Sequence, residues 1–144
     1  MGKHFFRKKM AVRHLKKAME KKKAQSILVF LEGPHGSGKT FVVHKFAKKH
    51  KRTTILSCRD VVKRIGKKES DLSSISASSL GECIVLDNVE YLRGRDQTQE
   101  RMVQLIGNWR KNGTHVIVSG VDTKNRLPKF VELLGEADYS VDLS

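Results

Sequence analysis

The sequence predicts an α/β protein in which a five-stranded parallel sheet is flanked by helices. Short apolar runs alternate along the chain with segments whose apolar residues recur every three or four positions, which is typical of parallel sheets. The runs are apolar throughout rather than at every second residue, as expected for strands that are covered on both faces. With 144 residues, the chain is long enough to bury a single hydrophobic core.

The order of the predicted elements follows from this patterning. Strands are expected at 26–32, 53–57, 83–87, 115–120 and 139–143. Helices are expected at 7–23, from Lys39 to the basic cluster at 48–52, and at 59–65, 97–112 and 126–135. The serine-rich stretch 66–82 is expected to form a loop or a marginal helix. Trp109 is expected to pack in the core rather than to stack on a nucleic-acid base.

The chain is strongly basic, with 29 Lys and Arg residues against 15 Asp and Glu and a formal net charge of +14. A field of this sign favours anionic partners, although a basic surface without a dedicated partner is the alternative. Residues 1–25 form a predicted basic amphipathic helix, which precedes a core domain over 26–144. The lysines of this helix and the cluster 48–52 are candidate DNA contacts, whereas docking of the helix on the core is its simpler role.

Composition also indicates the compartment. Cys58 and Cys83 lie far apart, each next to a predicted strand, so we expect reduced, inert thiols rather than a disulfide. No apolar run approaches the roughly 20 residues that a membrane span needs, and the N-terminus lacks the hydrophobic stretch of a signal peptide. We therefore expect a cytoplasmic protein without a membrane span.

The segment GPHGSGKT (33–40) has the residue spacing of a phosphate-binding loop, and it lies between a predicted strand and a predicted helix. Its glycines allow successive main-chain N–H groups to converge on phosphate oxygens. Lys39 is placed to reach the terminal phosphates of ATP or ADP, and the Thr40 hydroxyl is placed to bind Mg²⁺. The expected nucleotide-binding residues are Gly33, Pro34, His35, Gly36, Ser37, Gly38, Lys39 and Thr40, with no chemistry assigned to the His35 side chain.

A second group of site residues is expected at the ends of other strands. The strand CIVLD (83–87) ends in Asp87, which is placed to hold the water shell of Mg²⁺. The strand 53–57 intervenes between the loop strand and this one, which resembles the ATPase division of P-loop NTPases (ASCE, AAA+ type) rather than the kinases and GTPases. The strand 115–120 offers Ser119 as a sensor of the terminal phosphate.

The segment 84–120 resembles the AAA+ core of the DnaA/Hda family of bacterial replication initiators. In that family a hydrophobic strand ends in two acids, followed by an aromatic–leucine pair, a glycine with a basic residue, and a Thr-Gln-Glu triplet. The corresponding residues here are Tyr91 and Leu92, Gly94 and Arg95, and Thr98, Gln99 and Glu100. The resemblance covers roughly residues 26–143. It implies an ATP- or ADP-binding core whose partners are DNA or a replication protein such as an initiator, helicase or clamp.

Departures from the family pattern concern catalysis. The second acid is replaced by Asn88, and an amide cannot accept a proton from attacking water. Glu90 and Ser119 are the other candidates for a catalytic role. The arginine that family members send into a neighbouring site is expected within 129–137, where the sequence has none. The sequence ends at the fifth predicted strand, without residues for the family's helical lid or DNA-binding helices.

These features predict a DnaA-like ATP- or ADP-binding factor in replication initiation or its regulation, with slow or absent ATP hydrolysis. Two alternatives stay open at this point: an active small NTPase or nucleotide kinase, and a module that binds a protein partner independently of nucleotide. Phosphate transfer to a nucleoside monophosphate would indicate the first alternative. Failure to bind either ATP or ADP would indicate the second.

Overall fold

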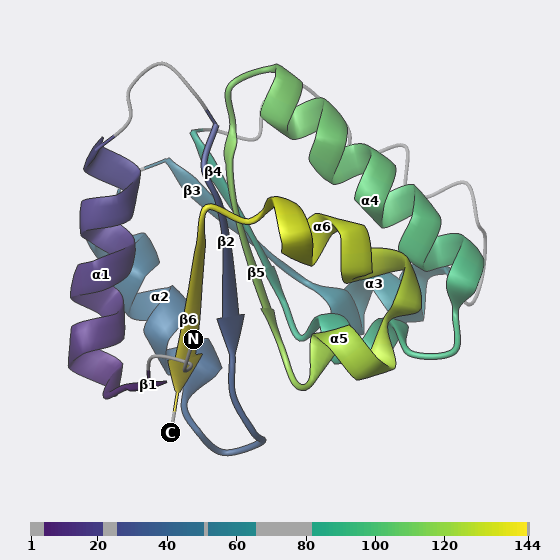
Figure 1. The fold of residues 1–144 in the computed structure, drawn as a ribbon, viewed down its shortest axis with the longest axis horizontal. Helices are drawn as coiled ribbons and strands as arrows, with labels where there is room; N and C mark the ends of the chain where they lie inside the picture. Colours follow the sequence, from purple (N-terminus) through teal and green to yellow (C-terminus); the bar gives the residue numbers. More distant parts are fainter. Residues whose placement is uncertain (1–4, 22–25, 51, 66–81, 144) are drawn as a thin grey trace.

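A computed structural model describes residues 5–21, 26–50, 52–65 and 82–143. Its framework is a parallel six-stranded sheet in the order β1-β6-β2-β5-β4-β3, with helices on both faces (Figure 1). The strands are β1 (Phe5–Phe6), β2 (Leu28–Glu32), β3 (Thr53–Ser57), β4 (Cys83–Asp87), β5 (His115–Gly120) and β6 (Tyr139–Leu143). The five predicted strands are confirmed, and β1 adds a short sixth strand beside β6.

The helices form two layers (Figure 1). One layer consists of α1 (Lys8–Lys21) and α2 (Lys39–Lys49), which lie side by side. The other layer contains α3 (Cys58–Ile65), η2 (Val89–Leu92), α4 (Asp96–Lys111), α5 (Thr123–Arg126), η3 (Pro128–Phe130) and α6 (Val131–Glu136). The serine-rich stretch 66–82, which was predicted to form a loop or a marginal helix, lies outside the described residues apart from its last residue.

Burial on both faces explains why the central strands are apolar throughout. In β2, Leu28 and Phe30 belong to the hydrophobic cluster under α3, α4 and α6, whereas Val29 and Leu31 belong to the cluster under α1 and α2. Successive side chains of a strand point to opposite faces, so each layer needs its own apolar set. Trp109 is 6% exposed and lies in the first of these clusters, which confirms its predicted place in the core.

The order of the strands corrects one prediction. The strand that separates β2 from β4 in the sheet is β5, whereas β3 (Thr53–Ser57) lies at the edge beyond β4. The position of a strand along the chain therefore did not give its position in the sheet, because the connection after β2 crosses over two strand positions. All five residues of β3 are half-buried, as expected for an edge strand.

A second correction concerns the helix predicted at 126–135. The structure has three short pieces there, α5, η3 and α6, and Pro128 begins the second of them. Proline has no N–H to donate and disfavours a helical conformation in the residue before it. Leu127 accordingly has φ −122° and ψ 83°, outside the helical region, and the chain changes direction at this point.

Both cysteines are free and buried, as predicted. Burial raises the pKa of the Cys83 thiol to about 12 and that of Cys58 further above its ordinary range. Thiolates are the reactive form, so neither cysteine is poised for nucleophilic chemistry at neutral pH.

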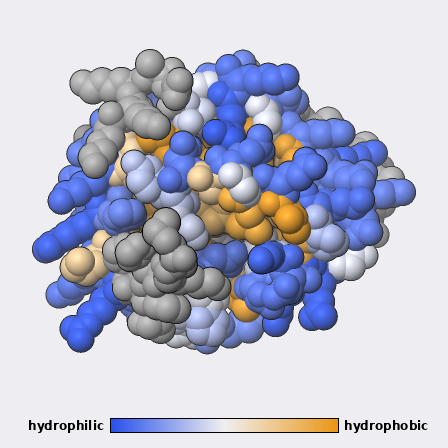
Figure 2. All heavy atoms as spheres, in the orientation of Figure 1, coloured by the Kyte–Doolittle hydropathy of each residue, from blue (hydrophilic) through white to orange (hydrophobic). Residues whose placement is uncertain are grey.

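Hydrophilic side chains dominate the view in Figure 2, and hydrophobic groups gather over the region of α6. Val131, at the start of α6, is 44% exposed.

Within the described part of the chain, no helix combines the length and the apolar character that crossing a bilayer requires.

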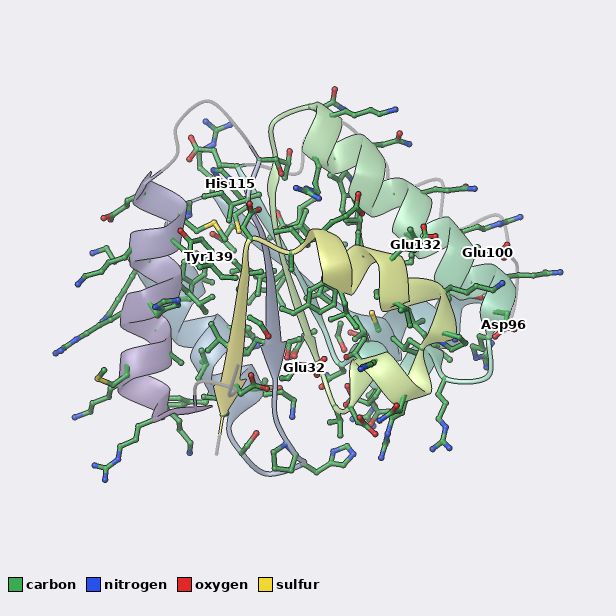
Figure 3. All side chains as sticks on the ribbon, in the orientation of Figure 1. Glu32, Asp96, Glu100, His115, Glu132 and Tyr139 are labelled. Carbon is green, nitrogen blue, oxygen red and sulfur yellow. The ribbon has the colours of Figure 1, made fainter. Side chains whose placement is uncertain are left out.

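His115 lies at the end of the sheet opposite to Glu32 (Figure 3). Its Nδ1 accepts a hydrogen bond of 3.0 Å from the main-chain N–H of Ile27, which requires this ring nitrogen to be unprotonated. Burial lowers the pKa of His115 from its ordinary value of 6.5, and the nearby His50 lowers it further, while Glu82 acts in the opposite direction. The fold therefore holds the neutral form of His115.

This environment predicts a loss of stability in weak acid. Because the pKa of His115 is lower in the folded than in the unfolded chain, protons bind the unfolded chain first as the pH falls. We expect the free energy of unfolding to decrease from about pH 6.5 downward until the folded pKa is reached, and the decrease to be smaller in His115→Gln. Urea unfolding at roughly pH 7.5 and pH 5.5 measures this difference. The exposed His44 provides a control, because His44→Gln should retain the full decrease; an undiminished decrease in His115→Gln would contradict the prediction.

Candidate functional site

The candidate site lies along the edge of the sheet that the carboxyl-terminal ends of the parallel strands form. The loop 33–40 leaves β2 at this edge and leads into α2, close to β1 and the start of α1 (Figure 1). The N–H of Gly33 donates to the carbonyl oxygen of Gly120 (3.3 Å), which ties the beginning of the loop to the end of β5. Asp87 ends β4, the next strand along the same edge.

The conformation of the loop requires glycine at several positions. Gly36 and Gly38 have φ angles of +80° and +96°, in the left-handed region that other residues rarely adopt. A Cβ atom on Gly33 would lie 2.5 Å from Oγ of Ser37. Gly38 precedes α2 without a side-chain cap, so the first N–H groups of this helix face the loop. Such an arrangement suits an anion, because N–H groups and the helix dipole both favour negative charge there.

Lys39 is 6% exposed, and its ammonium group is held inside the loop. Nζ donates hydrogen bonds to the carbonyl oxygens of Gly33 (2.7 Å) and Pro34 (3.0 Å). Burial lowers the pKa of Lys39, and the negative charges of Glu90 and Asp87 oppose this effect. Because two neutral carbonyls are weaker partners for an ammonium group than an anion, Lys39 can exchange them for phosphate oxygens.

Thr40 and Asp87 meet across the gap between α2 and β4. The hydroxyl of Thr40 donates to Oδ2 of Asp87 (2.9 Å), and the main-chain N–H of Asn88 donates to Oδ1 (3.0 Å). Asp87 is 2% exposed, so the carboxylate is fixed in position. One hydroxyl and one carboxylate are a donor set that suits Mg²⁺, which keeps several waters and takes further ligands from substrate phosphates.

The structure also brings the three catalytic candidates Asn88, Glu90 and Ser119 to the ends of these strands. Oε1 of Glu90, in η2, is buried without a hydrogen-bond partner among the described residues, and the Glu90 charge acts on Lys39. Ser119 is fully buried beside Leu31 of β2, and its Oγ likewise has no partner in the described ranges. Asn88 adopts φ +60°, which asparagine tolerates better than most residues. Their roles in catalysis stay predictions.

Sequence reasoning missed two polar residues of the site. Glu32 ends β2 (Figure 3), and burial raises the pKa of its carboxyl group. Thr123, in α5, is 1% exposed and lines a hollow of about 310 Å³ together with Glu32 and Gly33. Glu32 could have been found, because it is an acid between an apolar run and the glycine loop. Thr123 carries no such signal, since the turn after β5 alone brings it there.

The fold and the glycine loop at the carboxyl ends of the strands together define the class of protein. The sequence profile of the family described as "ATPase family associated with various cellular activities (AAA)" matches residues 29–138. The match covers more than half of the chain, and the chain belongs to the AAA family. The class predicted from the sequence is thus confirmed. A search of curated proteins gave no match.

Solved structures with the same fold include replication proteins. Domain III of DnaA from Thermotoga maritima has a TM-score of 0.76 and 12% identity, over 96% of this chain and 62% of that one. The replication initiator DnaA bound to AMPPCP and single-stranded DNA has a TM-score of 0.67 and 18% identity, over 94% and 44%. The DnaC helicase loader has a TM-score of 0.63 and 15% identity, over 98% and 93%. The chain thus spans about half the length of the DnaA chain that is bound to AMPPCP and single-stranded DNA, and it shares the fold of the matched part.

Proposed function

We propose that this protein is a DnaA-like factor that binds ATP or ADP with Mg²⁺ and acts in the initiation of DNA replication or its regulation, with slow or absent hydrolysis. The observation that carries the proposal is the assembled loop 33–40. Its left-handed glycines, the buried ammonium of Lys39 and the Thr40–Asp87 hydrogen bond converge at the start of α2.

Each of these groups has a defined task in holding a nucleotide. The amides of the loop and of the first turn of α2 would bind phosphate oxygens, and Lys39 would turn from the carbonyls of Gly33 and Pro34 to the terminal phosphates. Thr40 and Asp87 would hold Mg²⁺, which neutralises phosphate charge when it is bound. Ser119 would donate its hydroxyl hydrogen to the end of the phosphate chain.

The structural relatives support a role in replication. A DnaA structure with this fold contains AMPPCP and single-stranded DNA, and DnaC is described as a helicase loader. The DnaC chain is matched over 93% of its length, which is nearly the whole of that structure. A cytoplasmic factor that contacts DNA or another replication protein, such as an initiator, helicase or clamp, is consistent with both.

Nucleotide binding is tested most directly at Lys39. We expect Lys39→Ala to weaken ADP and ATP binding by about tenfold or more, because the substitution removes a charge-assisted hydrogen bond to phosphate. Isothermal titration calorimetry with each nucleotide measures the effect, and Asp87→Asn should reduce the gain in affinity that Mg²⁺ provides. Lys48→Ala removes an equal charge from the exposed end of the same helix and should bind like wild type. Absence of ADP and ATP binding by the wild-type protein would overturn the proposal in favour of a nucleotide-independent module.

Slow hydrolysis follows from the residue after Asp87. Asn88 holds the position where family members have an acid, and its amide cannot accept a proton from water. Glu90 is nearby, but it lies two residues further along the chain, in η2. Position 88 therefore offers no carboxylate that could orient the attacking water.

Restoring the acid should accelerate the reaction. We expect Asn88→Asp to raise the single-turnover rate of ATP cleavage by about tenfold or more, since a positioned base contributes on the order of 10²–10⁴-fold. Aspartate also tolerates the left-handed backbone at this position. The control is Asn88→Ser, which introduces no base and should leave the rate low. Fast cleavage by the wild-type protein would contradict slow hydrolysis.

The DNA part of the proposal rests on the ends of α1 and α2. Both helices run away from the loop and lie side by side (Figure 1). Lys16 and Lys17 of α1 are exposed, as are Lys48 and Lys49 of α2. Phosphate groups of DNA bind such lysines through counterion release. Arg52, which belongs to the cluster 48–52, already pairs with Glu82 at 3.5 Å.

A salt titration distinguishes this basic surface from general basicity. We expect the double variant Lys16→Gln/Lys48→Gln to bind single-stranded DNA more weakly and with a shallower dependence of log K on log salt, by about 0.7 for each phosphate that is no longer neutralised. Lys111→Gln/Lys124→Gln has the same net charge but changes other surfaces, and it should keep the wild-type slope. Equal slopes in the two double variants would remove this surface from the proposal, and no DNA binding at low salt would remove DNA itself.

A further inference from the structure

Lys8 of α1 reaches the phosphate-binding loop from another part of the chain. A Cβ atom on Gly38 would collide with Cε of Lys8 and lie 3.1 Å from its Nζ, so the lysine side chain passes directly over this glycine. Gly38 precedes the first turn of α2, whose N–H groups face the loop. A second ammonium group therefore lies at the start of α2, in addition to that of Lys39.

The placement of Lys8 is imposed by the packing of α1. Ala11, Val12 and Leu15 are buried in the cluster that α1 shares with α2. These residues follow Lys8 within two turns, so the start of α1 cannot move away from the loop without exposing them. Lys8 itself stays exposed, and its long side chain can shift toward a ligand.

The surroundings of Lys8 carry excess positive charge. Its Nζ lies 5.6 Å from the centre of the Phe41 ring, and Nζ of Lys45 lies 5.7 Å from the same ring. No carboxylate of the described residues forms an ion pair with either lysine. The ring attracts both cations weakly, whereas an anion between them would also relieve their mutual repulsion.

An unsatisfied hydroxyl group lies behind this place, on the side of the loop that faces Gly33. Lys8, Phe41 and Ser37 line one surface hollow of about 780 Å³. Ser37 is 9% exposed, and its Oγ has no hydrogen-bond partner within the described ranges. A buried hydroxyl without a partner is costly unless a ligand completes its hydrogen bonds.

We propose that Lys8 is a second ammonium ligand of the nucleotide's phosphate chain, contributed by α1 across the start of α2 from Lys39. The inference rests on the proposed function and adds a residue to it that lies outside the loop. Phosphate oxygens would draw the Lys8 ammonium from the Phe41 ring and accept a hydrogen bond from it. Nucleotide occupancy is thereby coupled to α1, the helix that also contributes lysines to the basic surface.

ADP binding by single-charge variants tests this assignment. We expect Lys8→Gln to raise the Kd for ADP by about fivefold and to reduce the dependence of Kd on salt, because the phosphate chain then has one ammonium partner fewer. Lys8→Arg keeps the charge and should stay within about twofold of wild type. Lys111→Gln removes an equal charge on α4, far from the loop along the chain, and should bind ADP like wild type. Thermal unfolding without nucleotide should be the same in all four proteins.

The possible outcomes separate the inference from the function on which it rests. Wild-type ADP binding with an unchanged Kd and salt dependence in Lys8→Gln would overturn the role of Lys8 and leave nucleotide binding standing. Weaker ADP binding by both Lys8→Gln and Lys111→Gln would mean that net charge alone causes the effect, and it would also overturn the role of Lys8. Absence of ADP binding by the wild-type protein would overturn the proposed function together with this inference.

Discussion

The parallel pairing of β2 with β5 and of β5 with β4 is the constraint on which the candidate site depends. Parallel strands end at a common edge, so the loop after β2, Ser119 near the end of β5 and Asp87 at the end of β4 come together. The register is fixed by buried residues, since both faces of these strands are covered. A shift of one residue would move every side chain to the opposite face, and the site would be lost with the core.

Within this frame, the site concentrates charge in a place with little solvent. A buried ammonium group is held by two carbonyls, while Asp87, Glu90 and Glu32 lie close enough to oppose the effect of burial on its pKa. Such an arrangement is costly, because several buried polar atoms of the site have no hydrogen-bond partner among the described residues. A ligand that binds the ammonium group and completes the hydrogen bonds of the hydroxyl groups would offset this cost, which is consistent with the nucleotide proposed above.

The first helix shows how one element can serve two purposes. Its apolar stripe, which includes Ala11, Val12 and Leu15, packs on α2 and is part of the core. The lysines on its other side stay in solvent, and its first residue reaches the loop. Docking on the core uses one side of this helix, and the proposed contact with anions would use the other. The two roles are therefore compatible, because docking of α1 on the core fixes the position of its exposed lysines.

The strands, the glycine loop and Asp87 could be predicted from the sequence alone, because each depends on local chemistry: continuous apolar runs, residues that tolerate left-handed backbone, and an acid after a buried strand. The sequence did not indicate that β5 rather than β3 separates β2 from β4, nor that Pro128 divides the last helical region into three pieces. It also contained no sign of the positions of Thr123 and Lys8. These features depend on which elements pack together, and contacts between residues far apart in the chain are decided by the tertiary structure.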